Sequence, residues 1–123
     1  MNREQLECYI LETYAASSDN PWAKWPNYKV FRHIDNQKWF ALVMNVPAAK
    51  LGRSGEAIID VVNLKCDPPL IASLLAESGF YPAYHMSKDT WVTVELDAVE
   101  DNKLQVLLDM SFIATASKSA KDQ

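Results

Sequence analysis

The chain has 123 residues, with 12 Lys and Arg against 16 Asp and Glu, so its formal net charge is −4. This length predicts one domain with a single core, and 49% hydrophobic with 23% charged residues excludes a disordered chain. The acidic balance excludes a protein that coats nucleic acid with its whole surface, because that mode needs Lys and Arg against the phosphates. We expect residues 1–116 to form the domain and residues 117–123 to form a frayed polar tail.

A helix is predicted first, over residues 3–14. Its apolar side chains recur at the spacing of one helix face, as shown by Leu6, Tyr9, Ile10 and Tyr14. Asn2 and Gln5 have the spacing of a capping box at its start. Residues 15–21 are turn formers that end in proline, and we expect them to stop the helix.

Three strands are predicted next, over residues 28–34, 38–46 and 57–64, because these runs are rich in β-branched and aromatic residues. The polar residues 35–37 predict a hairpin between the first two runs. The second run is apolar at successive positions, which is typical of a central strand covered on both faces. Three consecutive strands predict a meander.

A second helix of about ten residues is predicted from Asp67 to Gly79. Asp67 is expected to cap its free amides, prolines suit its first turn, and Gly79 is expected to end it in a left-handed conformation. Two strands are predicted after it, over residues 80–85 and 91–96. Pro82 favours an edge position for the first of them.

The last predicted helix covers residues 102–116, with Asn102 expected at its cap. Its apolar arc is wide, because Val106, Met110 and Ile113 lie beside the core stripe. The order of helix, three strands, helix, two strands and helix predicts an α+β fold, with two layers and an antiparallel sheet.

Neither a metal site nor a catalytic constellation is predicted. Two His and two Cys form no C-x-x-C and no pair of histidines one helical turn apart. Glu95 and Asp97 share one side of a strand, the single carboxylate arrangement suited to acid/base chemistry, but no apolar neighbour in the sequence separates their pKa values. We therefore expect no cofactor and predict that the protein is not an enzyme.

No window approaches the roughly 20 apolar residues that cross a bilayer. Residues 1–5 are polar and charged apart from Met1, and no apolar export signal follows them. We expect no membrane association and a cytoplasmic location.

Charge is distributed unevenly along the chain. Residues 1–19 carry a net charge of −3, residues 20–65 a net charge of +4, and residues 66–123 a net charge of −5. The basic segment also holds Trp22, Trp25, Tyr28, Phe31, Trp39 and Phe40. Cations among flat rings suit nucleic acid, since charges meet phosphates and rings stack on bases. The alternative is that the rings form core and the lysines solvate strand edges.

Three stretches of the sequence form a recognisable set of motifs. They are Tyr28-Lys29-Val30-Phe31-Arg32-His33, Pro82-Ala83-Tyr84-His85-Met86-Ser87-Lys88 and Trp91-Val92-Thr93-Val94-Glu95-Leu96-Asp97. Together they resemble the MmcQ/YjbR family of small bacterial proteins. The resemblance covers nearly the whole chain, and it implies a CyaY-like or secretion-chaperone-like α+β fold with the element order given above. The residues that carry it most specifically are Pro82, Tyr84, His85, Met86, Trp91, Thr93 and Asp97.

The resemblance also implies DNA binding through a double wing of β-hairpins. On that interpretation the contacts with DNA come from Lys29, Arg32, Lys38, Arg53, Lys88 and Trp91. The motif can instead determine the fold, with Tyr84 and His85 hydrogen-bonded to the turn before the last strand and Trp91 packed over them.

Two other functions stay open at this point. A protein-interaction or chaperone-like adaptor would use Val106, Met110 and Ile113, or a sheet edge, to hold a client or a second copy of the chain. A small-molecule site would gather around Tyr84, His85, Lys88, Trp91 and Glu95. A buried His85 bonded to backbone would argue against the small-molecule site.

Overall fold

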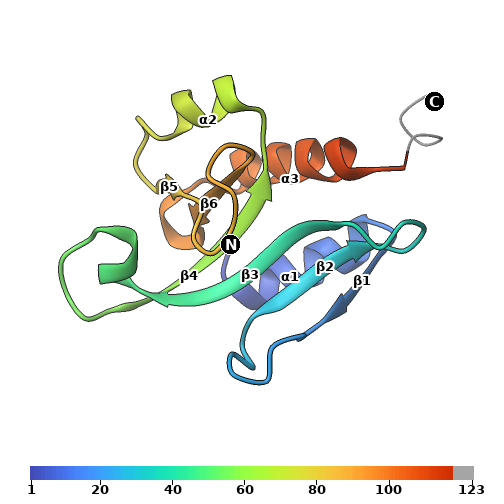
Figure 1. The fold of residues 1–123 in the computed structure, drawn as a ribbon, viewed down its shortest axis with the longest axis horizontal. Coiled ribbons are helices and arrows are strands. Elements are labelled where there is room, and N and C mark those ends of the chain that lie inside the picture. Colours follow the sequence, from blue (N-terminus) through green and yellow to red (C-terminus); the bar gives the residue numbers. More distant parts are fainter. Residues whose placement is uncertain (118–123) are drawn as a thin grey trace.

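The computed structural model describes residues 1–117, which form a six-stranded antiparallel sheet with three helices on one face (Figure 1). The strands are β1 (Ala16–Asp19), β2 (Lys29–His33), β3 (Trp39–Pro47), β4 (Ile58–Lys65), β5 (Phe80–Pro82) and β6 (Trp91–Glu95). They lie in the order β1-β2-β3-β4-β6-β5. The helices are α1 (Arg3–Thr13), α2 (Pro68–Leu74) and α3 (Asp101–Thr115). The predicted α+β fold is confirmed; of the predicted tail, residues 118–123 lie outside the described residues.

β1 lies inside the segment that the sequence predicts as a turn. It pairs with β2 in a register that runs from Ala16 opposite His33 to Asp19 opposite Val30. Its Ala-Ser-Ser-Asp sequence has little intrinsic preference for strands. The free edge of β2 supplies the hydrogen-bond partners, so tertiary pairing overrides local propensity here.

The structure corrects three details of the predicted helix caps and ends. The capping box of Asn2 and Gln5 is confirmed at α1, but the Asp67 side chain makes no capping hydrogen bond at α2. Pro68 and Pro69 occupy the first two helical positions, so of the two amides that a cap side chain binds, the second and the third, one has no hydrogen to donate. α2 ends at Leu74, before Gly79. α3 begins at Asp101 with Glu100 as its N-cap, two residues before the predicted cap Asn102.

Gly79 lies in the turn between α2 and β5 with a φ of +93°. A Cβ atom at this position would lie 2.9 Å from the side chains of Ala98 and Val99. Both the left-handed backbone and the close neighbours require glycine.

The helix-covered face of the sheet holds the main core. The three helices contribute Leu6, Ile10, Ile71, Leu74, Leu104, Leu107 and Leu108 to it, and the sheet contributes Phe31, Phe40, Val43, Val62, Leu64, Val92 and Val94. The predicted inward side of residues 91–96 is confirmed by Val92 and Val94.

A bulge in β3 sends neighbouring side chains to the same side. Phe31 pairs with Ala41 and Arg32 pairs with Trp39, so Phe40 is the extra residue. Phe40 and Ala41 both join the core beneath the helices. Trp39 therefore lies on the opposite, helix-free face, where Arg32 lies over its ring.

Within residues 1–117, no helix combines the length and apolarity that crossing a bilayer requires. The same residues contain no cluster of three or more His, Cys, Asp or Glu side chains that could hold a metal ion. The cytoplasmic location stays a prediction.

Candidate functional site

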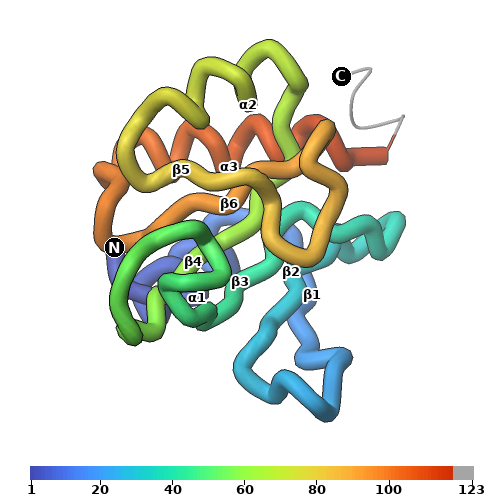
Figure 2. The backbone as a smooth tube through the Cα atoms, turned by 60° about the vertical axis from the view of Figure 1, so that its left-hand side comes forward, coloured from blue at the N-terminus to red at the C-terminus, as the bar shows by residue number. Residues whose placement is uncertain are grey.

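The helix-free face of the sheet is covered by loops. Its buried cluster contains Tyr28, Val30, Leu42, Met44, Val46, Ala48, Ile59 and Val61. Residues 20–28, which join β1 to β2, and residues 83–90, which join β5 to β6, bring Trp22, Tyr84 and Met86 onto this cluster. Figure 2 shows the 20–28 loop extending away from the sheet. Loops fill space less evenly than helices, and this face is hollowed.

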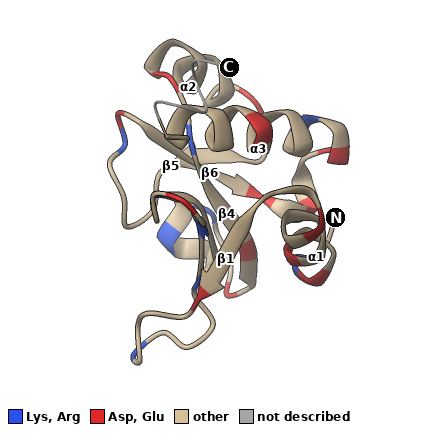
Figure 3. Cartoon of the chain, turned by 90° about the vertical axis from the view of Figure 1, so that its right-hand side faces the viewer, with Lys and Arg blue, Asp and Glu red and all other residues tan. Residues whose placement is uncertain are grey.

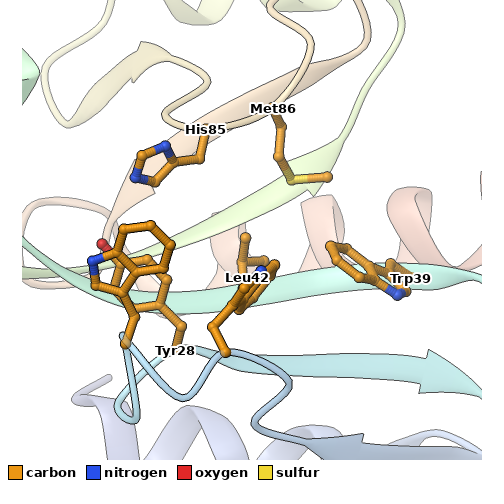
Figure 4. Close-up of a pocket in the computed structure, with 7 residues that line it drawn as sticks. Tyr28, Trp39, Leu42, His85 and Met86 are labelled. Carbon is orange, nitrogen blue, oxygen red and sulfur yellow. The ribbon is translucent and has the colours of Figure 1, made fainter.

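The aromatic pocket is a hollow of about 200 Å³ between these two loops. It is lined by Trp22, Trp25, Tyr28, Trp39, Leu42, His85 and Met86. In Figure 4, Met86 extends from its loop toward Leu42, while Tyr28 and His85 lie on either side of the gap. A dry cavity of about 150 Å³ accepts a benzene ring, so the volume suits one planar ring system.

The aromatic rings that line the pocket pack against one another. Trp25 stacks on Tyr28 with an angle of 9° between their planes and 5.6 Å between their centroids. Trp22 meets Trp39 edge to face at 5.5 Å and 90°. His85 lies 5.6 Å from Trp25 and 6.2 Å from Tyr28. Burial, followed by the nearby Tyr84, raises the pKa of Tyr28, so its hydroxyl is a hydrogen-bond donor at neutral pH.

Asn20 holds the first loop closed. Its Nδ2 donates to the carbonyls of Pro26 and Tyr28, each at 3.0 Å. The amides of Trp25 and Tyr28 donate to the carbonyls of Trp22 and Trp25, both at 3.1 Å. Two successive turns therefore place three aromatic side chains on one short loop.

A buried polar clamp fixes the second loop. Asn63 Nδ2 donates to the carbonyl of Tyr84 at 2.7 Å, and the amide of Tyr84 donates to Thr93 Oγ1 at 2.9 Å. Thr93 Oγ1 in turn donates to Asn63 Oδ1 at 2.5 Å. Both side chains are fully buried. Because each polar atom has a partner, the clamp holds the loop backbone at low cost.

His85 follows directly after the clamped residue and has a φ of +65°. The left-handed conformation costs a non-glycine residue about 1–2 kcal/mol. It persists because the backbone of Tyr84, just before it, is fixed and because Lys88, three residues after it, closes the loop by donating from Nζ to the carbonyl of Ala83 at 3.0 Å. The result is an exposed imidazole held against Trp25.

A second hollow, which we name the lysine hollow, lies beside the pocket. It has a volume of about 400 Å³ and is lined by Lys24, Trp25, Pro26, Asn27, Tyr28, Asn45, Pro47, Lys50 and Tyr84. Trp25 and Tyr28 belong to both hollows. Among residues 1–117, neither Lys24 nor Lys50 has a carboxylate within ion-pair distance. Their positive charges are therefore available to a ligand.

The local charge favours an anionic ligand over a cationic one. Lys24 Nζ lies 5.1 Å from the Trp25 ring centroid, and the Arg32 guanidinium lies 5.5 Å from the centroid of Trp39. A quaternary ammonium would meet ring faces that already have cations beside them. Among the described lining residues neither hollow contains a carboxylate. Acidic residues lie on α1 and α3 and on strands and loops outside the hollow linings (Figure 3).

The hairpin cations predicted to bind DNA are placed differently. Lys29 lies on the helix-covered side and pairs with Glu7 of α1 at 2.7 Å. Arg32 makes two hydrogen bonds with Asp19, at 3.0 and 3.1 Å.

The other predicted contacts are scattered. Arg53 lies in the loop before β4 and pairs with Glu95 at 2.8 Å. Lys38 is exposed at the β2–β3 turn, Lys88 lies in the β5–β6 loop, and Trp91 begins β6. Of the six, Arg32 and Trp91 lie on strands of the helix-free face, and none lines either hollow.

The family-motif residues divide between scaffold and pocket. Pro82 ends the edge strand β5, Thr93 and Tyr84 form the clamp, and His85 and Met86 line the aromatic pocket. Asp97 is exposed in the 3₁₀ turn that follows β6. The Tyr84 amide donates to the Thr93 hydroxyl, and the Trp91 amide donates to the carbonyl of Ser87 at 3.1 Å. These bonds to β6 use the loop backbone rather than the side chains of Tyr84 and His85.

The predicted small-molecule cluster is brought together in part. His85 is exposed and Tyr84 reaches the lysine hollow, whereas Glu95 binds Tyr81 and Arg53, each at 2.8 Å. Burial and this carboxylate raise the pKa of Tyr81. Lys24 and Lys50 are functional candidates that the sequence did not single out, because they become special only through their position beside Trp25 and Tyr84.

The chain was compared with known families, proteins and structures. The YjbR family model matches residues 11–113. An uncharacterized protein of Bacillus subtilis (strain 168), YyaQ, is 38% identical over 116 residues, which are 94% of this chain and 98% of YyaQ. A crystal structure of a Pseudomonas syringae protein has a TM-score of 0.91 at 44% identity, covering 94% of this chain and all of that one. The Deinococcus radiodurans protein DR2400 shares the fold, with a TM-score of 0.71 at 23% identity, over 94% of this chain and 79% of that one.

Proposed function

The chain belongs to the YjbR family, and from this premise and the geometry of the helix-free face we propose that it binds single-stranded nucleic acid, with an unpaired base stacked in the aromatic pocket. The observation that carries the proposal is the position of the pocket directly beside the lysine hollow. Proteins that bind single strands combine the same two components, rings that stack on bases and cations that follow the phosphates.

An unpaired base fits this face better than a duplex does. A base inside a duplex is stacked on both sides and cannot enter a pocket. Three of the predicted hairpin cations, Lys29, Arg32 and Arg53, already have carboxylate partners, which reduces the charge available to duplex phosphates. Lys38 and Lys88 serve as outer phosphate contacts in this proposal.

Binding to labelled oligonucleotides tests the proposal. An oligothymidylate of about 15 nucleotides is expected to raise fluorescence anisotropy and quench tryptophan emission with a Kd of about 1–100 μM at physiological salt, the range of non-specific binding, and more tightly at low salt. The four lysine–phosphate contacts of the proposal, from Lys24, Lys50, Lys38 and Lys88, predict that log K falls with log salt at a slope of about −2.8. A duplex of the same length is expected to bind more weakly. Absence of single-strand binding at about 0.1 mM protein in low salt would contradict the proposal.

A pair of tryptophan variants separates the pocket from the predicted hairpin surface. Trp39→Ala removes a pocket wall and is expected to weaken binding about 5- to 150-fold, since stacking on one ring contributes about 1–3 kcal/mol. Trp91→Ala is the matched control, because Trp91 lies on the same side of the sheet outside the pocket lining. Urea unfolding of both variants checks that they fold. Equal losses in the two variants would favour the hairpin surface over the pocket.

The adaptor function stays a prediction. The outer face of α3 exposes Val106, Met110 and Ile113, with exposed fractions of 57%, 39% and 62%. Sedimentation velocity decides whether this face joins two copies. Ile113→Lys would then dissociate the dimer, and Leu11→Lys on the exposed side of α1 would not. A monomer at all concentrations removes the homodimer form of the adaptor.

A further inference from the structure

We propose that the aromatic pocket and the lysine hollow together form a site for one nucleotide unit, a planar heteroaromatic ring joined to an anionic phosphate. This inference rests on the proposed function and deepens it. It names the smallest ligand that the site recognises, and it requires that both hollows are occupied at once.

The first step is that the two hollows share a wall. Trp25 and Tyr28 line both of them, and their rings are stacked almost in parallel. A ligand that crosses this wall places one end in each hollow. A single ring fills only the aromatic pocket and leaves the lysine hollow to water.

The second step is that the two hollows differ in chemistry. The pocket side presents indole, imidazole, thioether and leucine surfaces, which suit a flat and weakly polar group. The other side presents the ammonium groups of Lys24 and Lys50 with the amides of Asn27 and Asn45. Ammonium and amide N–H groups donate to phosphate oxygens, and no carboxylate among the described lining residues opposes them.

The third step is that both loops that line the two hollows are held in place without a ligand. Asn20 closes the loop that carries Trp25, and the clamp of Asn63 and Thr93 fixes the loop that carries His85. A preformed site loses less conformational freedom on binding. A single nucleotide can therefore bind measurably, without the neighbouring contacts that a longer strand adds.

The chemistry is shared by a free mononucleotide and by the phosphorylated end of a strand. Isothermal titration with thymidine monophosphate, thymidine and inorganic phosphate, each alone, tests the two-part site. The monophosphate is expected to bind about 10-fold or more tightly than either fragment, because hydrogen bonds to a charged group are the stronger ones. Oligothymidylates with and without a 5′-phosphate then distinguish a strand end from a free nucleotide.

Substitutions in each hollow test which hollow binds the ring and which binds the phosphate. Lys50→Gln is expected to lower the affinity for the monophosphate and to leave that for thymidine unchanged, whereas Trp22→Ala lowers both. Lys103→Gln is the matched control, because this lysine pairs with Glu77 on the helix side.

The outcomes distinguish the two-part site from the proposed binding of single strands. A monophosphate that binds no more tightly than thymidine, or that is insensitive to Lys50→Gln, overturns the two-part site. Oligonucleotide binding without monophosphate binding also overturns it and leaves the proposed function standing. Monophosphate binding without oligonucleotide binding supports the two-part site and overturns the strand function. If neither the monophosphate nor the oligonucleotide binds, both the two-part site and the strand function are overturned.

Discussion

The two faces of the sheet exclude water by different means. Beneath the helices, aliphatic side chains from α1, α2 and α3 pack on Phe31, Phe40 and the valines of the central strands. On the other face, rigid aromatic rings on two loops rest on Leu42 and its neighbours and leave two hollows. Helices bring many side chains into register along a strand, whereas loops bring a few large ones. The same sheet therefore has one face built for stability and one with room for a ligand.

The comparison is tested most strongly by truncating a leucine on each face. Leu108 and Leu42 are almost completely buried, with exposed fractions of 0% and 2%. Leu108→Ala is expected to lower the free energy of unfolding by about 4–5 kcal/mol, and Leu42→Ala by about 2–3 kcal/mol. The second loss is smaller because the new space opens into an existing hollow. Urea unfolding measures both, and a Leu42→Ala loss equal to that of Leu108→Ala would contradict the difference in packing.

Breaking the polar clamp beneath the second loop is expected to have the next largest effect on the unfolding free energy. Thr93→Val removes a hydroxyl that donates to Asn63 and accepts from the amide of Tyr84. Leaving these two groups without a partner is expected to cost about 1–3 kcal/mol in unfolding free energy, and to weaken oligonucleotide binding through the loosened His85 loop. Thr93→Ser retains the hydroxyl and should recover most of both. No recovery in the serine variant would show that the methyl group, rather than the clamp, matters.

We expect His33, which is buried on the helix-covered face, to make the unfolding free energy depend on pH. Burial lowers the pKa of His33 below 6.5, and Lys38 adds to this, while Asp35 and the Phe112 backbone act in the opposite sense. The unfolded chain therefore takes up the proton at a higher pH than the folded chain does. The stability that neutral His33 contributes is present above pH 6.5 and is lost as the pH falls below it.

The effect of pH on the unfolding free energy is expected to be smaller than the effects of the two leucine substitutions and of Thr93→Val. Urea unfolding at a series of pH values measures it, and His33→Gln should remove the part of the slope that lies just below pH 6.5. An unchanged slope in His33→Gln would assign the pH dependence to other groups.

The smallest effect is expected at the ion pair on the sheet edge. Arg32 and Asp19 join β2 to β1, and both side chains are in contact with solvent. Arg32→Ala is expected to lower the unfolding free energy by about 0.2–1 kcal/mol. A double-mutant cycle with Asp19→Ala measures the coupling. A coupling above about 2 kcal/mol would show that this edge is more than a surface contact.

Local patterns in the sequence predicted most of the elements. The spacing of Leu6 and Ile10 indicated α1, and the alternation from Trp91 to Leu96 indicated β6 with its inward valines. Predictions from local sequence patterns were wrong where contacts with residues distant in the sequence decide the secondary structure. β1 forms because β2 has a free edge, and the Asp67 side chain makes no capping hydrogen bond although its position suits one.

The candidate site was predicted only in fragments. The aromatic residues of the basic segment and the motif around His85 were both singled out from the sequence, but nothing in it shows that residues 22–28 and 85–86 meet. They meet because β2, β3, β4 and β6 lie side by side and because the two loops fold onto one face. The ion pairs that occupy Lys29 and Arg53 follow from the same folding.

The sequence by itself determined the α+β fold, the family, and the +4 segment within a chain of net charge −4, because periodicity, motifs and charge are local properties. The tertiary structure decided which of those charges are available. Lysines that look alike in the sequence differ once folded, since Lys29 faces a glutamate of α1 while Lys24 and Lys50 line a hollow without a carboxylate among its described residues. Electrostatic attraction depends on distance in space, which the order of residues along the chain does not give.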